Sequence, residues 1–147
     1  MIKKTLPDKY IREAIIDKFD LNNVTGYFDS RHFIENSGFL NGNPYILLGV
    51  QSSSVQNTKC ENYWLSDIRI EVCQYFNSTG NGINRAPVED KLNDVISALN
   101  SLEDVVLNTT DNQKIISTKF NIPSDIITPG LNKSIIRKIL TIQMKIA

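Results

Sequence analysis

The sequence has few of the residues that catalytic and metal sites use. His32 is the single histidine among 147 residues, and Cys60 and Cys73 are the only cysteines. The two cysteines lie too far apart for the short spacing of structural zinc sites, and a lone histidine without a serine or cysteine partner is most often a surface residue. We therefore expect no catalytic residues, no metal site and no cofactor, and two free thiols in a reducing compartment.

Long apolar runs and an excess of charge are also missing. The apolar stretches are only a few residues long, whereas about 20 are needed to span a bilayer, and the N-terminal residues contain no apolar core of a signal peptide. Sixteen basic and sixteen acidic residues cancel. Proteins that grip nucleic acid usually carry a basic excess. These features predict a cytosolic chain with no membrane segment, and they remain compatible with a protein that only guides DNA.

A phosphate-binding loop is not recognisable. Gly80-Asn-Gly82 is not followed by the Lys-Ser/Thr pair of a nucleotide-binding loop. The start of the following helix offers free backbone donors, so phosphate binding is conceivable there. A linker between a strand and a helix is the simpler interpretation, and an enzyme that uses residues 77–88 is kept as an alternative.

Residues 63–76 form the clearest element. Ile68, Ile70 and Val72 alternate with Asp67, Arg69 and Glu71, which is the pattern of a strand with one buried face. A strand covered on both faces would show a continuous apolar run, so this one predicts an antiparallel or mixed sheet. The evenly spaced charges are interpreted as a cross-strand ladder or a solvated face, not as catalytic carboxylates.

The polar face of this strand has apolar ends. Tyr63, Leu65, Cys73 and Tyr75 lie on it, on either side of the three charged residues. An apolar surface of this kind calls for a covering layer. A helix or a second subunit would provide that layer, and we select these four residues as the candidate subunit interface.

Two amphipathic helices are predicted, at residues 8–19 and from Pro87 to about residue 102. Each begins with proline in its first turn and with acidic residues close behind, as the helix dipole favours. Apolar residues recur on one face of each: Ile11, Ala14, Ile15 and Phe19 in the first, and Val88, Leu92, Val95, Ile96, Leu99 and Leu102 in the second.

The remaining segments complete an α+β domain. Residues 45–50 read as a central strand followed by a polar loop at 51–62, and short strands are expected near 24–28, 105–107 and 114–120, with a closing strand at 134–146. We expect a single domain over residues 1–147, with a mostly antiparallel sheet of about four to six strands packed by the two helices.

The order of these elements resembles the tail-completion and tail-terminator proteins of tailed bacteriophages. The first helix is followed by Val24-Thr-Gly-Tyr-Phe-Asp29, then by the strand Pro44-Tyr-Ile-Leu-Leu-Gly49. A polar loop, the long alternating strand, a glycine turn, a helix with Ala98-Leu99 near its end and a terminal strand complete the pattern. The likeness spans about residues 8–146.

The resemblance implies a structural role without catalysis. Such proteins form six-fold or twelve-fold homo-oligomeric rings at the head–tail junction or tail end, between portal or connector and tail proteins, and DNA passes through the lumen without specific binding. It implies a location in the virion after assembly in the host cytoplasm. The loops at 51–62, 77–85 and 121–133 would reach neighbouring rings. A small cytosolic α+β binding or inhibitor protein without catalysis is the alternative.

Overall fold

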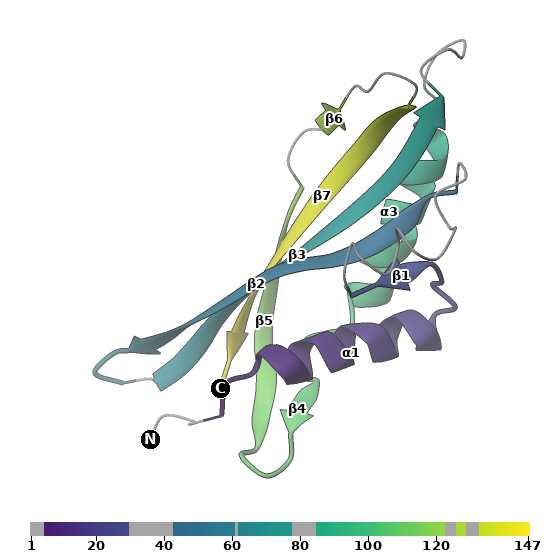
Figure 1. Cartoon of the computed structure of the whole chain (residues 1–147). Helices are drawn as coiled ribbons and strands as arrows, with labels where there is room; N and C mark the ends of the chain where they lie inside the picture. The colour runs from purple at the N-terminus through teal and green to yellow at the C-terminus, as the bar shows by residue number, and fades with distance from the viewer. Residues whose placement is uncertain (1–4, 30–42, 61, 78–84, 123–125, 129–132) are drawn as a thin grey trace.

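A computed structural model describes residues 5–29, 43–60, 62–77, 85–122, 126–128 and 133–147. In chain order the elements are α1 (Asp8–Leu21), β1 (Tyr27–Phe28), β2 (Tyr45–Asn57), β3 (Asn62–Asn77), α3 (Ala86–Leu99), β4 (Val106–Asn108), β5 (Gln113–Asn121), β6 (Ile126–Thr128) and β7 (Lys133–Ile146). Figure 1 shows their arrangement. The predicted α+β class with two helices is confirmed.

All described strands belong to one mixed sheet. Their order is β1-β2-β3-β7-β5-β4, and the short β6 pairs with β7 (Figure 1). β1 runs parallel to β2, and the other pairs are antiparallel. The longest ladder joins β3 to β7, from Trp64 opposite Ile146 to Asn77 opposite Lys133. The strand predicted at 63–76 is therefore the centre of the sheet.

The hydrophobic core lies between the two helices and one face of this sheet. The buried residues of α1 are the four that the sequence predicted, and α3 buries Val88, Leu92, Val95, Ala98 and Leu99. They pack against the isoleucines of β3 and β7, such as Ile70 and Ile142, which have no exposed surface. Burial of each such side chain contributes about 1.5–3 kcal/mol. We call this face of the sheet the inner face.

One charged residue interrupts the inner face of β7. Lys138 lies opposite Val72, and its Nζ is 3.9 Å from a carboxylate oxygen of Glu89 on α3. The pair places the ammonium group at the border of the core, where it need not be fully desolvated. Ile139, the residue that breaks the polar side of β7, is 5% exposed on the opposite face.

β2 differs from its prediction, because residues 51–57 continue the strand and are not a loop. They pair with β3 from Gln51 opposite Ile68 to Asn57 opposite Asn62. A backbone ladder needs no apolar side chains, so a polar sequence forms a strand when a long partner lies beside it. A bulge between Leu48 and Gln51 separates the buried first part of β2 from this polar second part.

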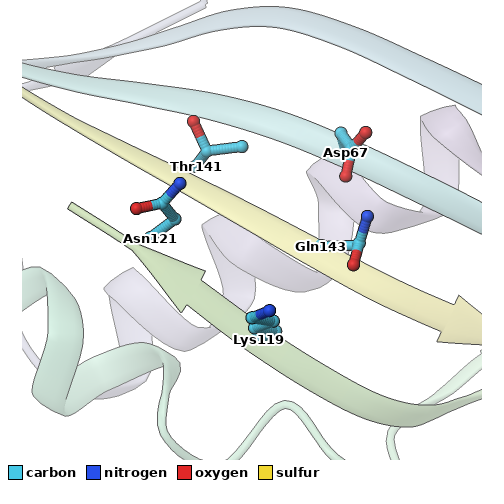
Figure 2. A pocket seen from close by; sticks show the side chains of 5 residues that line it. All are labelled: Asp67, Lys119, Asn121, Thr141 and Gln143. Atoms are coloured by element: carbon cyan, nitrogen blue, oxygen red, sulfur yellow. The ribbon is translucent and has the colours of Figure 1, made fainter. Parts of the chain in front are cut away.

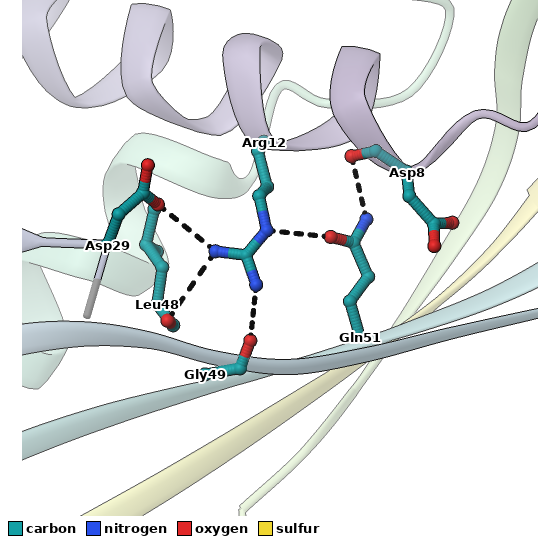
Figure 3. A network of polar contacts seen from close by, with 6 residues as sticks. All are labelled: Asp8, Arg12, Asp29, Leu48, Gly49 and Gln51. Atoms are coloured by element: carbon teal, nitrogen blue, oxygen red, sulfur yellow. Dashed lines mark hydrogen bonds and ion pairs between the residues drawn. The ribbon is translucent and has the colours of Figure 1, made fainter. Parts of the chain in front are cut away.

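Arg12 ties α1 to β2 at this bulge, as Figure 3 shows. Its Nε donates to Oε1 of Gln51 at 2.8 Å, and its other nitrogens contact the carbonyl oxygens of Leu48 and Gly49 and the carboxylate of Asp29. Gly49 lets β2 lie close to β3 at the bulge: a Cβ there would lie 3.0 Å from the backbone oxygen of Arg69. The guanidinium thus satisfies carbonyls that the bulge removes from the ladder.

Candidate assembly surface

The sheet face turned away from the helices is the outer face, and it is the candidate functional surface. The odd-numbered residues of β3 and β7 lie on it, because successive side chains of a strand point to opposite faces. Three zones follow one another along β3: an apolar end around Cys73, a charged middle around Arg69, and a second end at Tyr63 and Leu65.

The apolar end is a small core of its own. Tyr45, Leu47 and Cys73 are buried there, and Phe28, Tyr75 and Ile135 pack around them. The rings of Tyr45 and Tyr75 stack with centroids 6.3 Å apart. This cluster lies across the sheet from the main core, so the first half of β2 is covered on both faces.

Cys73 does not fit its proposed place in a subunit contact. It has no exposed surface within the single chain, so it presents nothing for a neighbour to touch. Its thiol behaves as a small apolar group inside the cluster. Tyr75 beside it is half-buried, and its role in a contact stays a prediction.

The sequence of β2 contains a pattern that indicates this cluster, although the alternation of β3 suggested a polar outer face. Tyr45-Ile-Leu-Leu48 is a continuous apolar run, which is typical of a strand covered on both faces. The run therefore pointed to a second apolar layer beside Cys73 and Tyr75. Tyr45, which is 1% exposed, is the residue on the outer face that the prediction missed.

The charged middle of the outer face contains an ion pair along one strand. Nη2 of Arg69 lies 3.2 Å from Oε1 of Glu71, and both residues belong to β3. Glu71 is 6% exposed, so the pair is shielded on the carboxylate side. Arg69 and Glu71 lie on the same strand, so this contact does not cross between strands. A cross-strand ladder was one of the two interpretations of this segment, and a solvated face was the other.

A shallow polar groove of about 270 Å³ crosses the outer face beside this pair (Figure 2). Asp67 of β3, Thr141 and Gln143 of β7, and Lys119 and Asn121 of β5 line it. The groove offers one carboxylate, one ammonium group and neutral hydrogen-bonding groups. Such a surface suits polar contacts with a partner, because each of these side chains can donate or accept hydrogen bonds.

Tyr63 and Leu65 lie at the other end of β3, far along the strand from Cys73 and Tyr75. Nζ of Lys145 on β7 lies 4.4 Å from the centre of the Tyr63 ring, a cation–π contact. Both Tyr63 and Leu65 are half-buried. The four predicted interface residues thus occupy two separate ends of the outer face and do not form one patch.

The described part of the chain contains no cluster of three histidine, cysteine, aspartate or glutamate side chains placed to hold a metal ion. Among the same residues, no helix is long and apolar enough to cross a membrane. His32 and the segment Gly80–Gly82, considered as possible catalytic and phosphate-binding positions, lie outside the described residues.

Among the residues that the structure describes, Tyr27 and Lys91 have shifted pKa values, and neither lies on the outer face. The hydroxyl of Tyr27 donates to Asp20 at 2.6 Å, and this bond to a carboxylate raises the pKa of Tyr27. Partial burial on α3 lowers the pKa of Lys91, while the charge of Asp94 opposes that change. Both shifts arise from helix packing and do not indicate an acid–base site.

The fold has a counterpart among solved structures. A chain of the "Virion of native gene transfer agent (GTA) particle" superposes on this one with a TM-score of 0.55 at 15% sequence identity. The match covers 92% of this chain and 94% of that chain. No family model matches the sequence. No curated protein sequence matches it either. At this identity the likeness establishes a shared fold.

Proposed function

We propose that this protein is a non-catalytic structural protein of a phage-like virion. It forms a homo-oligomeric ring, six-fold or twelve-fold, at the head–tail junction or the tail end, where it joins portal or connector proteins to the tail. The observation that carries the proposal is the fold shared over nearly the full length of both chains with a protein of a gene transfer agent particle. The match covers 92% of this chain and 94% of that chain, so the two proteins share their architecture over nearly their full lengths.

The charge distribution supports a passage that does not retain DNA. Acidic and basic residues balance over the chain, and on the outer face of β3 Arg69 lies between the carboxylates of Asp67 and Glu71. A surface with a strong basic excess would bind phosphates and slow the passage of DNA. The protein therefore guides DNA through a lumen without specific binding.

A closed ring needs two different complementary patches on each subunit, because its contacts are heterologous. The half-buried Tyr63 and Leu65 at one end of the outer face, and Tyr75 at the other, are the apolar residues assigned to such contacts. Aromatic side chains that are partly covered in the free subunit lose little conformational entropy when a partner covers them further.

The proposal is tested by the mass and symmetry of the purified protein. Light scattering should give a multiple of the 16.6 kDa chain mass, and electron microscopy should show closed rings that join particles containing portal protein. A monomer at all concentrations that also fails to join such particles contradicts the proposal. That outcome would favour the alternative, a small cytosolic binding or inhibitor protein.

A further inference from the structure

Of the four long strands β2, β3, β7 and β5, the two outer ones, β2 and β5, each have a segment whose outward side is not paired with any described strand. β1 pairs with β2 only at Ile46 and Leu47, so residues 51–57 are bonded on one side only, to β3. β4 pairs with β5 only at Gln113 and Lys114, so β7 is the described strand that pairs with residues 117–121. At this edge the backbone nitrogen of Thr118 donates to a carboxylate oxygen of Glu103 at 3.3 Å. We call these segments the β2 edge and the β5 edge.

Both edges have little of the protection that monomeric proteins give to such strands, and on the β5 edge it consists of Lys119 and of Glu103, which accepts from the backbone of Thr118. Charged residues and proline on an edge normally block pairing with another chain. The β2 edge reads Gln-Ser-Ser-Ser-Val-Gln-Asn and contains neither, and the β5 edge has a single lysine. Exposed aliphatic residues border both edges: Val50 and Val55 are 74% and 39% exposed, and Ile116 and Ile122 are 37% and 44% exposed.

Both edges lie at the same level of the sheet. Ser54 pairs with Leu65, Leu65 pairs with Lys145, and Lys145 pairs with Ser117. The bulges of the two edge strands, at Gly49–Val50 and at Ile116, lie outside the regular segments. A second copy placed beside the first at the same height therefore brings one free edge next to the other.

The strand directions also match. β2, β3, β7 and β5 are joined by three antiparallel pairs, so β2 and β5 run in opposite directions. If a neighbouring copy is related by rotation about an axis close to the strand direction, its strands run in the same directions as those of the first copy. Its β2 then meets the β5 of the first copy in antiparallel orientation, which is the pairing that continues the sheet.

We propose that the β5 edge of each subunit pairs with the β2 edge of the next subunit, which makes one continuous β-sheet across the subunits. One heterologous contact of this kind covers both free edges. Pairing of β2 with β2, or of β5 with β5, would leave the other edge of every subunit open. The inference rests on the proposed ring and states which backbone segments close it.

The first test adds a charge at each side of the contact: Val55 lies in the β2 edge, and Ile116 lies at the bulge next to the β5 edge. Val55→Lys and Ile116→Lys should each reduce the assembly to the 16.6 kDa single chain, because an ammonium group at the contact blocks strand addition. Leu21→Lys is the matched control: Leu21 is 76% exposed at the end of α1, away from both edges, and its variant should assemble as the wild type does. Unchanged circular dichroism and thermal unfolding show that each variant is folded.

The second test captures the pairing by a disulfide. Ser54→Cys and Ser117→Cys are combined with Cys60→Ser, which removes the exposed native thiol. Mild oxidation should produce a ladder of chain multiples on a denaturing gel. Each single-cysteine variant, which has one of the two introduced cysteines beside the buried Cys73, should stay uncross-linked. The register between the two strands in a ring can differ from this one by one or two residues. Ser52→Cys and Lys119→Cys are therefore tested in the same way.

The outcomes separate this inference from the proposed function. Rings that survive both lysine substitutions and give no ladder contradict the edge pairing while the structural role stands. Dimers from a single-cysteine variant show pairing of like edges and also overturn the inference. A wild-type chain that neither self-associates nor joins particles contradicts both.

Discussion

The two faces of the β3–β7 ladder are built from the same two strands and have opposite characters. On the inner face, Ile70 and Ile142 are fully buried beneath α1 and α3. On the outer face, Arg69 and Gln143 lie among polar neighbours, between the apolar cluster around Cys73 and the half-buried Tyr63 and Leu65. The inner face holds the subunit together, and the outer face leaves groups available for other contacts.

This difference separates stability from assembly within one sheet. A single strand carries residues for both tasks because its side chains alternate between faces. A substitution on β3 or β7 should therefore affect the fold at an even position, and the assembly at an odd position that is not buried, unlike Cys73 and Ile139. The following predictions test that separation, in order of expected effect on unfolding.

The largest loss is expected where α3 covers the inner face. Leu92 is 5% exposed, and Leu92→Ala should lower the free energy of unfolding by about 2–5 kcal/mol, since the cavity closes only partly. Equilibrium unfolding in urea measures the loss. A change below about 1 kcal/mol would show that α3 faces a partner or solvent, and the contrast between the two faces would fail.

A smaller loss is expected at the border between helix and sheet. Arg12→Met keeps much of the side-chain length and removes the contacts to Gln51, Asp29 and two backbone carbonyls. We expect a loss of about 1–3 kcal/mol, because those carbonyls become unsatisfied.

Lys9→Met is the control for Arg12→Met. Lys9 lies on the same helix with its side chain 76% exposed, and its ion pair with Glu13 is a surface contact. Its replacement should change the free energy of unfolding by less than about 0.5 kcal/mol. Equal losses for both variants would mean that Arg12 does not fix α1 to β2.

The smallest effect on stability is expected in the groove of the outer face. Asp67 lies in a polar, half-exposed position, so Asp67→Asn should change the free energy of unfolding by no more than about 0.5 kcal/mol. The same variant should be compared with the wild type for oligomer mass at low and high salt. A loss of several kcal/mol would assign Asp67 to the fold and not to the surface.

Local sequence patterns predicted much of the architecture. The buried residues of α1 and the alternation of β3 were both readable, because each depends only on the period of its own element. The closing strand was predicted at 134–146 and spans Lys133–Ile146. The sequence also showed that Lys138 interrupts the inner face of β7. The partner of Lys138, Glu89, lies on another element, α3.

The polar half of β2 and the position of Cys73 were not predictable in this way. Residues 51–57 lack an apolar pattern, and their strand depends on β3 lying alongside. Cys73 sits on the polar side of its own strand, yet Tyr45 and Leu47 of the neighbouring strand bury it. Both outcomes depend on contacts between segments that are distant in the chain.

By itself, the sequence determined the α+β class, the two helices and the face that each helix buries, because hydrophobic periodicity is a local property. The tertiary structure decided which strands are neighbours. This strand order places the apolar cluster around Tyr45, and it places the β2 edge and the β5 edge at the same height of the sheet. Strand order and register depend on pairing between distant segments, which no local pattern specifies.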